Sequence, residues 1–130
     1  MDGDLRKLLR KNLPQVHWVS VESGFTDLGI PDMNGCYEGR EFWVECKLAR
    51  GNVVRIRPGQ VAWMSRRVRC GGRVLVAVRR GEQLLLYSGE DAAALKEHGM
   101  TKVEPLAQWD GGPARWDWEG ILSVVSGRQA

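Results

Sequence analysis

The stretch EFWVECKL, at residues 41–48, decides the fold because polar and apolar residues alternate along it. Side chains point alternately to the two faces of a strand. Glu45 and Lys47 are therefore expected on one face, and Cys46 with its apolar neighbours on the other. This pattern predicts a strand that carries a carboxylate and an ammonium group side by side, backed by an apolar layer.

A second strand is predicted just upstream, at residues 32–37 (DMNGCY). The intervening residues 38–40 (EGR) suit the turn of an antiparallel hairpin. Pro31 has no N–H to donate to a strand ladder, so it is expected at the mouth of the strand with Asp32 next to it. Such a hairpin can bring Asp32 opposite the region of Glu45.

The remaining elements follow from hydrophobic periodicity and from the positions of glycine and proline. They are a helix at 5–13, a strand at 16–22, a helix that starts at Pro58 and stops at Gly71, strands at 73–78 and 82–87, a helix at 88–99, an irregular stretch at 100–116 and a short closing helix at 118–125. The order of helix, three strands, helix, two strands, helix and tail predicts an α/β fold in which helices flank a mixed β-sheet.

A single domain is expected over residues 1–130, with its core at about 16–87 and a C-terminal helix and Trp-rich tail at 88–130. In this tail Trp109, Trp116 and Trp118 are expected to form a satellite hydrophobic cluster or a dimer surface. They lie in the acidic part of the chain, so base stacking is not expected of them.

The composition excludes several classes of protein. A content of 43% hydrophobic and 27% charged residues is ordinary for a globular protein in water. No apolar run approaches the ~20 residues of a membrane span, and the N-terminus lacks a secretory signal, so a cytosolic location without membrane association is expected. Three cysteines without CxxC spacing predict neither a disulfide framework nor a zinc site.

Basic residues are concentrated in one part of the chain. Residues 47–80 hold ten basic residues and no acidic one, while the rest of the chain holds the other nine basic residues and all sixteen acidic ones. Such a run of charge can simply be a solvated surface. Here, however, apolar residues interrupt the run, and nine of the ten basic residues are arginine, which binds phosphate well. A polyanion partner is favoured, and the predicted DNA-binding residues are Arg50, Arg55, Arg57, Arg66, Arg67 and Arg69.

The pairing of Asp32 with Glu45 points to metal chemistry. Two carboxylates at hydrogen-bonding range raise each other's pKa unless a cation sits between them. Oxygen ligands of this kind select Mg²⁺ or Mn²⁺, which can polarise a phosphate oxygen and lower the pKa of bound water. Lys47 could orient the attacking water or neutralise charge on the phosphate.

With these motifs together the sequence resembles the PD-(D/E)XK nuclease superfamily, and within it the stand-alone, phage-like nucleases of the VRR-NUC branch. The resemblance covers about residues 18–80 and rests on GIPD at 29–32, ECK at 45–47 and QVAW at 60–63. It implies a restriction-endonuclease-like fold. Stand-alone members are similar to archaeal Holliday-junction resolvases.

The resemblance also implies a role for each motif residue. Asp32, Glu45 and the backbone carbonyl of Cys46 would be metal ligands, Lys47 the catalytic lysine, Glu22 a further metal or water ligand, and Gln60 the glutamine on the helix beside the active site. The alternative for Glu22 is a solvated carboxylate at the end of a strand. The alternative for Gln60 is a surface residue of the first helical turn.

The expected function is Mg²⁺-dependent hydrolysis of DNA phosphodiester bonds, with Mn²⁺ able to substitute, by a homodimer that resolves branched DNA such as Holliday junctions. One alternative is a flap or duplex nuclease without junction preference. Another is a nuclease-fold protein that binds DNA without cutting it. The complete set of Asp32, Glu45 and Lys47 argues against the last of these.

Overall fold

A computed structural model describes residues 2–21 and 28–127 of the chain. Its elements are α1 (Asp2–Asn12), β1 (His17–Ser20), β2 (Met33–Tyr37), β3 (Arg40–Leu48), α2 (Pro58–Arg69), β4 (Val74–Arg80), β5 (Gln83–Ser88), the 3₁₀ turn η1 (Gly89–Asp91), α3 (Ala92–His98), the 3₁₀ turn η2 (Met100–Lys102), β6 (Ala107–Trp109) and α4 (Trp118–Ser126). None of these helices is long and apolar enough to span a membrane.

In the part of the chain described, six strands form one sheet in the order β1-β2-β3-β4-β5-β6. Strands β3 and β4 pair in parallel, and the other neighbouring pairs are antiparallel. A parallel pair needs a long crossover, which the loop after β3 and helix α2 provide. The sheet is therefore mixed, as predicted.

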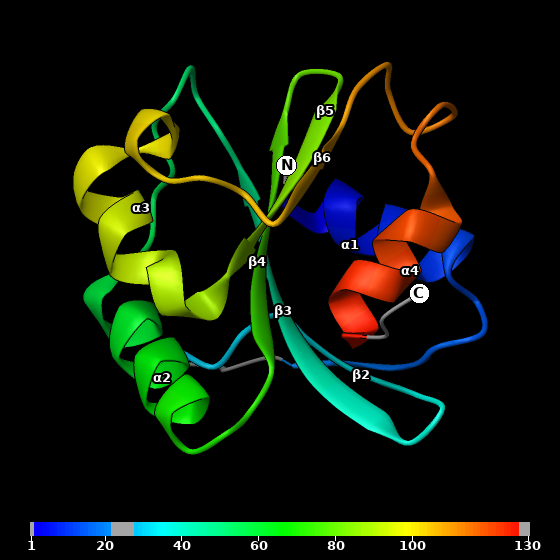
Figure 1. Ribbon diagram of the computed structural model, residues 1–130, viewed down its shortest axis with the longest axis horizontal. Helices are drawn as coiled ribbons and strands as arrows, with labels where there is room; N and C mark the ends of the chain where they lie inside the picture. The colour runs from blue at the N-terminus through cyan, green and yellow to red at the C-terminus, as the bar shows by residue number, and fades with distance from the viewer. Residues whose placement is uncertain (1, 22–27, 128–130) are drawn as a thin grey trace.

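Helices cover both faces of the sheet, with α1 and α4 on one side and α2 and α3 on the other (Figure 1). Each face has its own apolar core. Leu5 and Leu9 of α1 and Ile121 and Val125 of α4 belong to the first core. Met64 of α2 belongs to the second. This arrangement has the restriction-endonuclease-like form that the motifs imply.

Strand β3 contributes to both cores because its side chains alternate. Phe42, Val44 and Cys46 are fully buried in the core beneath α1 and α4. Trp43 packs on the opposite face, against the core beneath α2 and α3, and Glu45 reaches α2 on that same face. The alternation predicted for residues 41–48 is therefore confirmed.

The C-terminal part differs from its prediction in one strand. Residues 107–109 form β6, which pairs antiparallel with β5, whereas the whole stretch 100–116 was expected to be irregular. A strand of three residues is too short for a recognisable alternation. Its conformation depends on hydrogen bonds to β5.

The expectation of a satellite tryptophan cluster is wrong for Trp116. This side chain is 3% exposed and belongs to the main core beneath α1 and α4. Its indole N–H donates to the carbonyl of Glu82 at 2.9 Å, and its ring lies 5.7 Å from that of Trp118. Trp109 and Trp118 are half-buried against the same core, so the tail completes one face of the sheet.

Gly35 of β2 allows two aromatic rings to meet across the strand. The rings of Trp18 and Phe42, in β1 and β3, pack edge to face with their centroids 5.6 Å apart. A Cβ atom on Gly35 would lie 2.6 Å from the Phe42 ring and 3.0 Å from the Trp18 ring.

We expect Gly35→Ala to lower the free energy of unfolding by about 1–3 kcal/mol, the usual cost of overpacking. Urea denaturation measures this, with the neighbouring exposed Cys36→Ala as control, and an unchanged midpoint would contradict the prediction.

Candidate active site

Asp32 and Glu45 are tied together across the β2–β3 hairpin. The backbone N–H of Asp32 donates to Oε1 of Glu45 at 3.2 Å. In return, Oδ2 of Asp32 accepts from the backbone N–H of Cys46 at 2.9 Å. Each carboxylate thus accepts a bond from the backbone of the segment that carries the other, which places the two acidic groups at the same end of the hairpin.

Helix α2 adds Gln60 to the two carboxylates. Its Nε2 donates to Oε2 of Glu45 at 2.9 Å, and its Oε1 accepts from Nζ of Lys47 at 3.0 Å. Nζ of Lys47 also lies 3.4 Å from Oε2 of Glu45. A single amide therefore holds the acid and the base of the E-x-K motif at once.

The start of α2 sets the orientation of this amide. Pro58 occupies the first helical position, where its fixed φ is favourable. Arg57 precedes it with extended backbone, and its N–H donates to Oε1 of Gln60 at 2.9 Å. The bond that satisfies the helix terminus therefore also turns Oε1 towards Lys47 and leaves Nε2 for Glu45.

Two glycines bring the loop before Asp32 against α2. Gly29 has a φ of +74°, and a Cβ atom on it would overlap the backbone carbonyl of Gly59. The loop thus lies directly on the first turn of the helix, which fixes Asp32 relative to Gln60. No role for Gly59 is predicted from the sequence. The available signal was a glycine in the first helical turn, where it lowers helix stability unless a close contact requires it.

Glu45 is an unusual acid because it is 2% exposed. The pKa of its carboxyl is raised to about 7, first by burial and then by the nearby carboxylate of Asp32, while the ammonium group of Lys47 acts in the opposite direction. Without a metal ion the carboxyl of Glu45 is therefore partly protonated near neutral pH, and a cation bound beside it would favour the charged form.

The oxygen atoms of this cluster fit a small divalent cation. Asp32 and Glu45 provide carboxylates, and the backbone carbonyl of Cys46, the residue that follows Glu45 in β3, adds a third oxygen atom. Mg²⁺ is bound in many proteins by one or two carboxylates, with water completing the coordination. Among residues 4–21 and 28–127 there is no group of three or more His, Cys, Asp and Glu side chains suited to a metal. Glu22, the further ligand implied by the motifs, lies outside the described residues.

The six arginines predicted to bind DNA fall into two groups, and all are exposed. Arg50, Arg55 and Arg57 lie in the segment between β3 and α2 and at the start of the helix. Arg66, Arg67 and Arg69 lie in the last turn of α2. The two groups therefore lie towards the two ends of the helix that carries Gln60, and their role in DNA binding stays a prediction.

The fold of this chain is similar to that of a protein of known structure. No protein-family model and no curated protein sequence matches the chain. The solved structure of Hjc, a Holliday junction resolvase from the archaeal hyperthermophile Archaeoglobus fulgidus, superposes with a TM-score of 0.51 at 17% sequence identity. The match covers 67% of this chain and 72% of the resolvase. The predicted restriction-endonuclease-like α/β fold is thereby confirmed.

The raised pKa of Glu45 predicts how stability depends on pH without metal. The folded state holds this proton up to about pH 7, whereas the unfolded chain releases it near pH 4.5. The contribution of Glu45 to the free energy of unfolding is therefore fully present below pH 4.5. It falls as the pH rises to about 7, by about 3 kcal/mol at most. Urea denaturation in EDTA should show that Glu45→Gln removes this decline, and a parallel decline in both proteins would contradict the shift.

Proposed function

We propose that this protein is a metal-dependent deoxyribonuclease that hydrolyses DNA phosphodiester bonds, with Asp32, Glu45 and Lys47 at its active site. The observation that carries the proposal is the buried network in which Gln60 bonds to both Glu45 and Lys47 while Asp32 bonds across the hairpin. Burial of two carboxylates and an ammonium group costs desolvation free energy, which apolar side chains of similar size would not cost. The stability of the fold alone therefore does not explain why these charged groups are held together.

Asp32, Glu45 and the carbonyl of Cys46 are the proposed ligands of Mg²⁺, for which Mn²⁺ would substitute. When bound, the ion would polarise a phosphate oxygen and lower the pKa of a bound water. Lys47 would orient the attacking water or stabilise negative charge on the phosphate. Gln60 would keep the Lys47 ammonium group in place, and Glu22 is a further candidate ligand.

DNA is the proposed substrate because the segment from Lys47 to Arg80 holds ten basic residues and no acidic one. The first candidate is branched DNA. The Hjc protein with a similar fold is a Holliday junction resolvase, and the motifs resemble those of stand-alone VRR-NUC nucleases. A flap or duplex nuclease without junction preference is the second candidate. A DNA-binding protein without cleavage is disfavoured by the intact Asp32, Glu45 and Lys47.

Cleavage assays on end-labelled four-way junction, flap and linear duplex test this proposal. We expect cleavage with Mg²⁺ and none with EDTA. Lys47→Ala should lower the cleavage rate ~100-fold or more, as loss of a positioned acid–base group does, while DNA affinity changes only a few-fold. Lys7→Ala, which removes an exposed lysine on α1, is the matched control. Near-normal cleavage by Lys47→Ala would exclude a catalytic role for this lysine.

Symmetric cutting of a junction requires two active sites, so we also propose that the active form is a two-fold dimer. Light scattering at micromolar concentration should then give a mass near twice 14.6 kDa. The same preparation should nick paired strands of a junction at symmetric positions. A monomer that nicks one strand only would favour the flap-nuclease alternative.

A further inference from the structure

The face of α2 that reaches the active site continues along the helix to a pair of aromatic rings. Gln60 and Trp63 lie one turn apart on this face. Gln60 bonds to Glu45 of β3, and Trp63 contacts Trp43 of the same strand, with ring centroids 5.2 Å apart. Trp43 and Glu45 share a face of β3 and lie about 7 Å apart along it. The aromatic pair is therefore a direct neighbour of the candidate active site.

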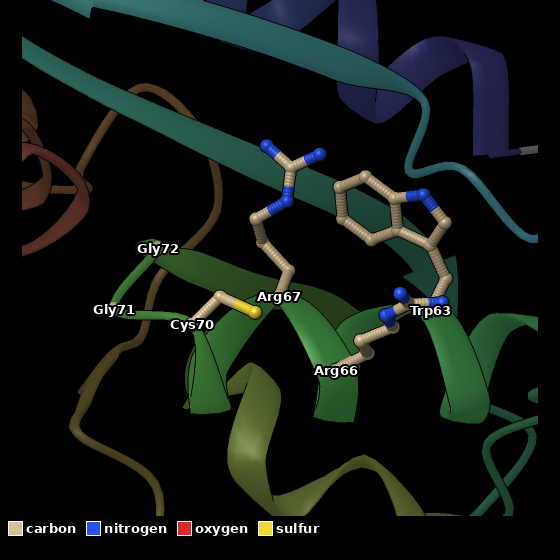
Figure 2. A pocket seen from close by; sticks show the side chains of 6 residues that line it. All are labelled: Trp63, Arg66, Arg67, Cys70, Gly71 and Gly72. Carbon is tan, nitrogen blue, oxygen red and sulfur yellow. The ribbon is translucent and has the colours of Figure 1, made fainter.

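A groove of about 700 Å³ opens beside this pair, at the C-terminal end of α2 (Figure 2). It is lined by Trp63, Arg66, Arg67, Cys70, Gly71 and Gly72. Its volume is in the range of pockets that bind small organic ligands. A single nucleotide can occupy a pocket of this size. Figure 2 shows the guanidinium group of Arg67 next to the indole ring of Trp63.

Arg67 is held in place before any ligand binds. The carbon of its guanidinium group lies 4.6 Å from the centre of the Trp63 ring and 5.5 Å from that of Trp43. A Cβ atom on Gly72 would lie 2.6 Å from the aliphatic carbons of Arg67, so the arginine stem lies against a backbone that lacks a side chain. An ordered guanidinium group loses little conformational entropy when it binds a ligand.

The chemistry of the groove fits a nucleotide with an exposed base. Unpaired bases stack on aromatic rings and on guanidinium planes, whereas the bases of an intact duplex are already stacked on each other. Arginine binds phosphate, and none of the six residues that line the groove is acidic. An arginine that served only to contact duplex phosphates would need no aromatic partners.

We propose that this groove binds one unpaired nucleotide of the DNA substrate, with its base stacked on the surface formed by Trp63 and Arg67 and its phosphate bound by Arg66. The inference rests on the proposed nuclease function and narrows its substrate class. The favoured DNA carries unpaired nucleotides close to the bond that is cut.

Fluorescence anisotropy in EDTA tests the groove separately from cleavage. The two ligands are a labelled oligothymidylate and an abasic strand of the same length and charge. The wild-type protein should bind the thymidylate at least ~5-fold more tightly, the lower end of the effect of one stacked base. Trp63→Leu should bind both strands with equal affinity, and Trp63→Phe should recover part of the preference. Arg67→Gln should reduce the preference as well.

Two variants remote from the groove are the matched controls. Trp109→Leu removes an indole in β6 that packs on the opposite face of the sheet, and Arg10→Gln removes an exposed charge on α1. Both should keep the preference for thymidylate. Equal binding of the two strands by the wild type, or an unchanged preference in folded Trp63→Leu or Trp63→Phe, overturns the proposal.

The outcome for the groove is separable from the outcome for the nuclease. Mg²⁺-dependent cleavage without any preference for bases would reject the nucleotide groove alone. A preference for bases that depends on Trp63, without cleavage of any DNA, would instead reject the nuclease and leave a single-strand binding site.

Discussion

The structure depends on the burial of one carboxylate, that of Glu45. A buried acid is unfavourable unless hydrogen bonds and opposite charge compensate for lost hydration. Here the compensation comes from three directions: the backbone N–H that precedes β2, the ammonium group of Lys47 and the amide of Gln60 on α2. The strand hairpin and the helix are therefore bonded to the same side chain. A change in the position of any of them would remove one of the partners of the buried carboxylate, so the site and the fold constrain each other.

The crossover between the two parallel strands explains why these groups meet. Because β3 and β4 are parallel, the chain must leave the end of β3 and return through α2. Glu45 and Lys47 lie towards the end of β3, and Gln60 lies in the first turn of the helix. The contact between Gly29 and Gly59 then seats the loop before Asp32 on that same turn. Three segments thus converge where the crossover helix begins, and two positions without side chains permit their close approach.

The sequence predicts the local parts of this arrangement and not the parts that depend on pairing. The two-residue period of 41–48 is local, so the faces of Glu45, Cys46 and Lys47 could be predicted from it. Strand β6 could not, because three residues carry no period and hydrogen bonds to β5 determine their conformation. The burial of Trp116 and the role of Gly59 also depend on contacts between distant segments. Gln60 is an intermediate case, since its place in the helix is readable but its double bond to Glu45 and Lys47 needs the tertiary structure.

The length of α2 relates the proposed catalytic and nucleotide sites. From Gln60 to Arg67 the helix rises about 10 Å, at 1.5 Å per residue. Adjacent nucleotides of a stacked strand rise about 3.4 Å, so this distance corresponds to about three nucleotides, or fewer in an extended strand. A nucleotide in the groove would therefore lie one to three positions from the bond that is cut. An intact duplex and a fully paired four-way junction have no unpaired base at that distance, but the single-stranded arm of a flap does. If both proposed sites exist, a preference for DNA with a single-stranded arm would arise within one subunit, from the spacing between the first and last turns of a single helix.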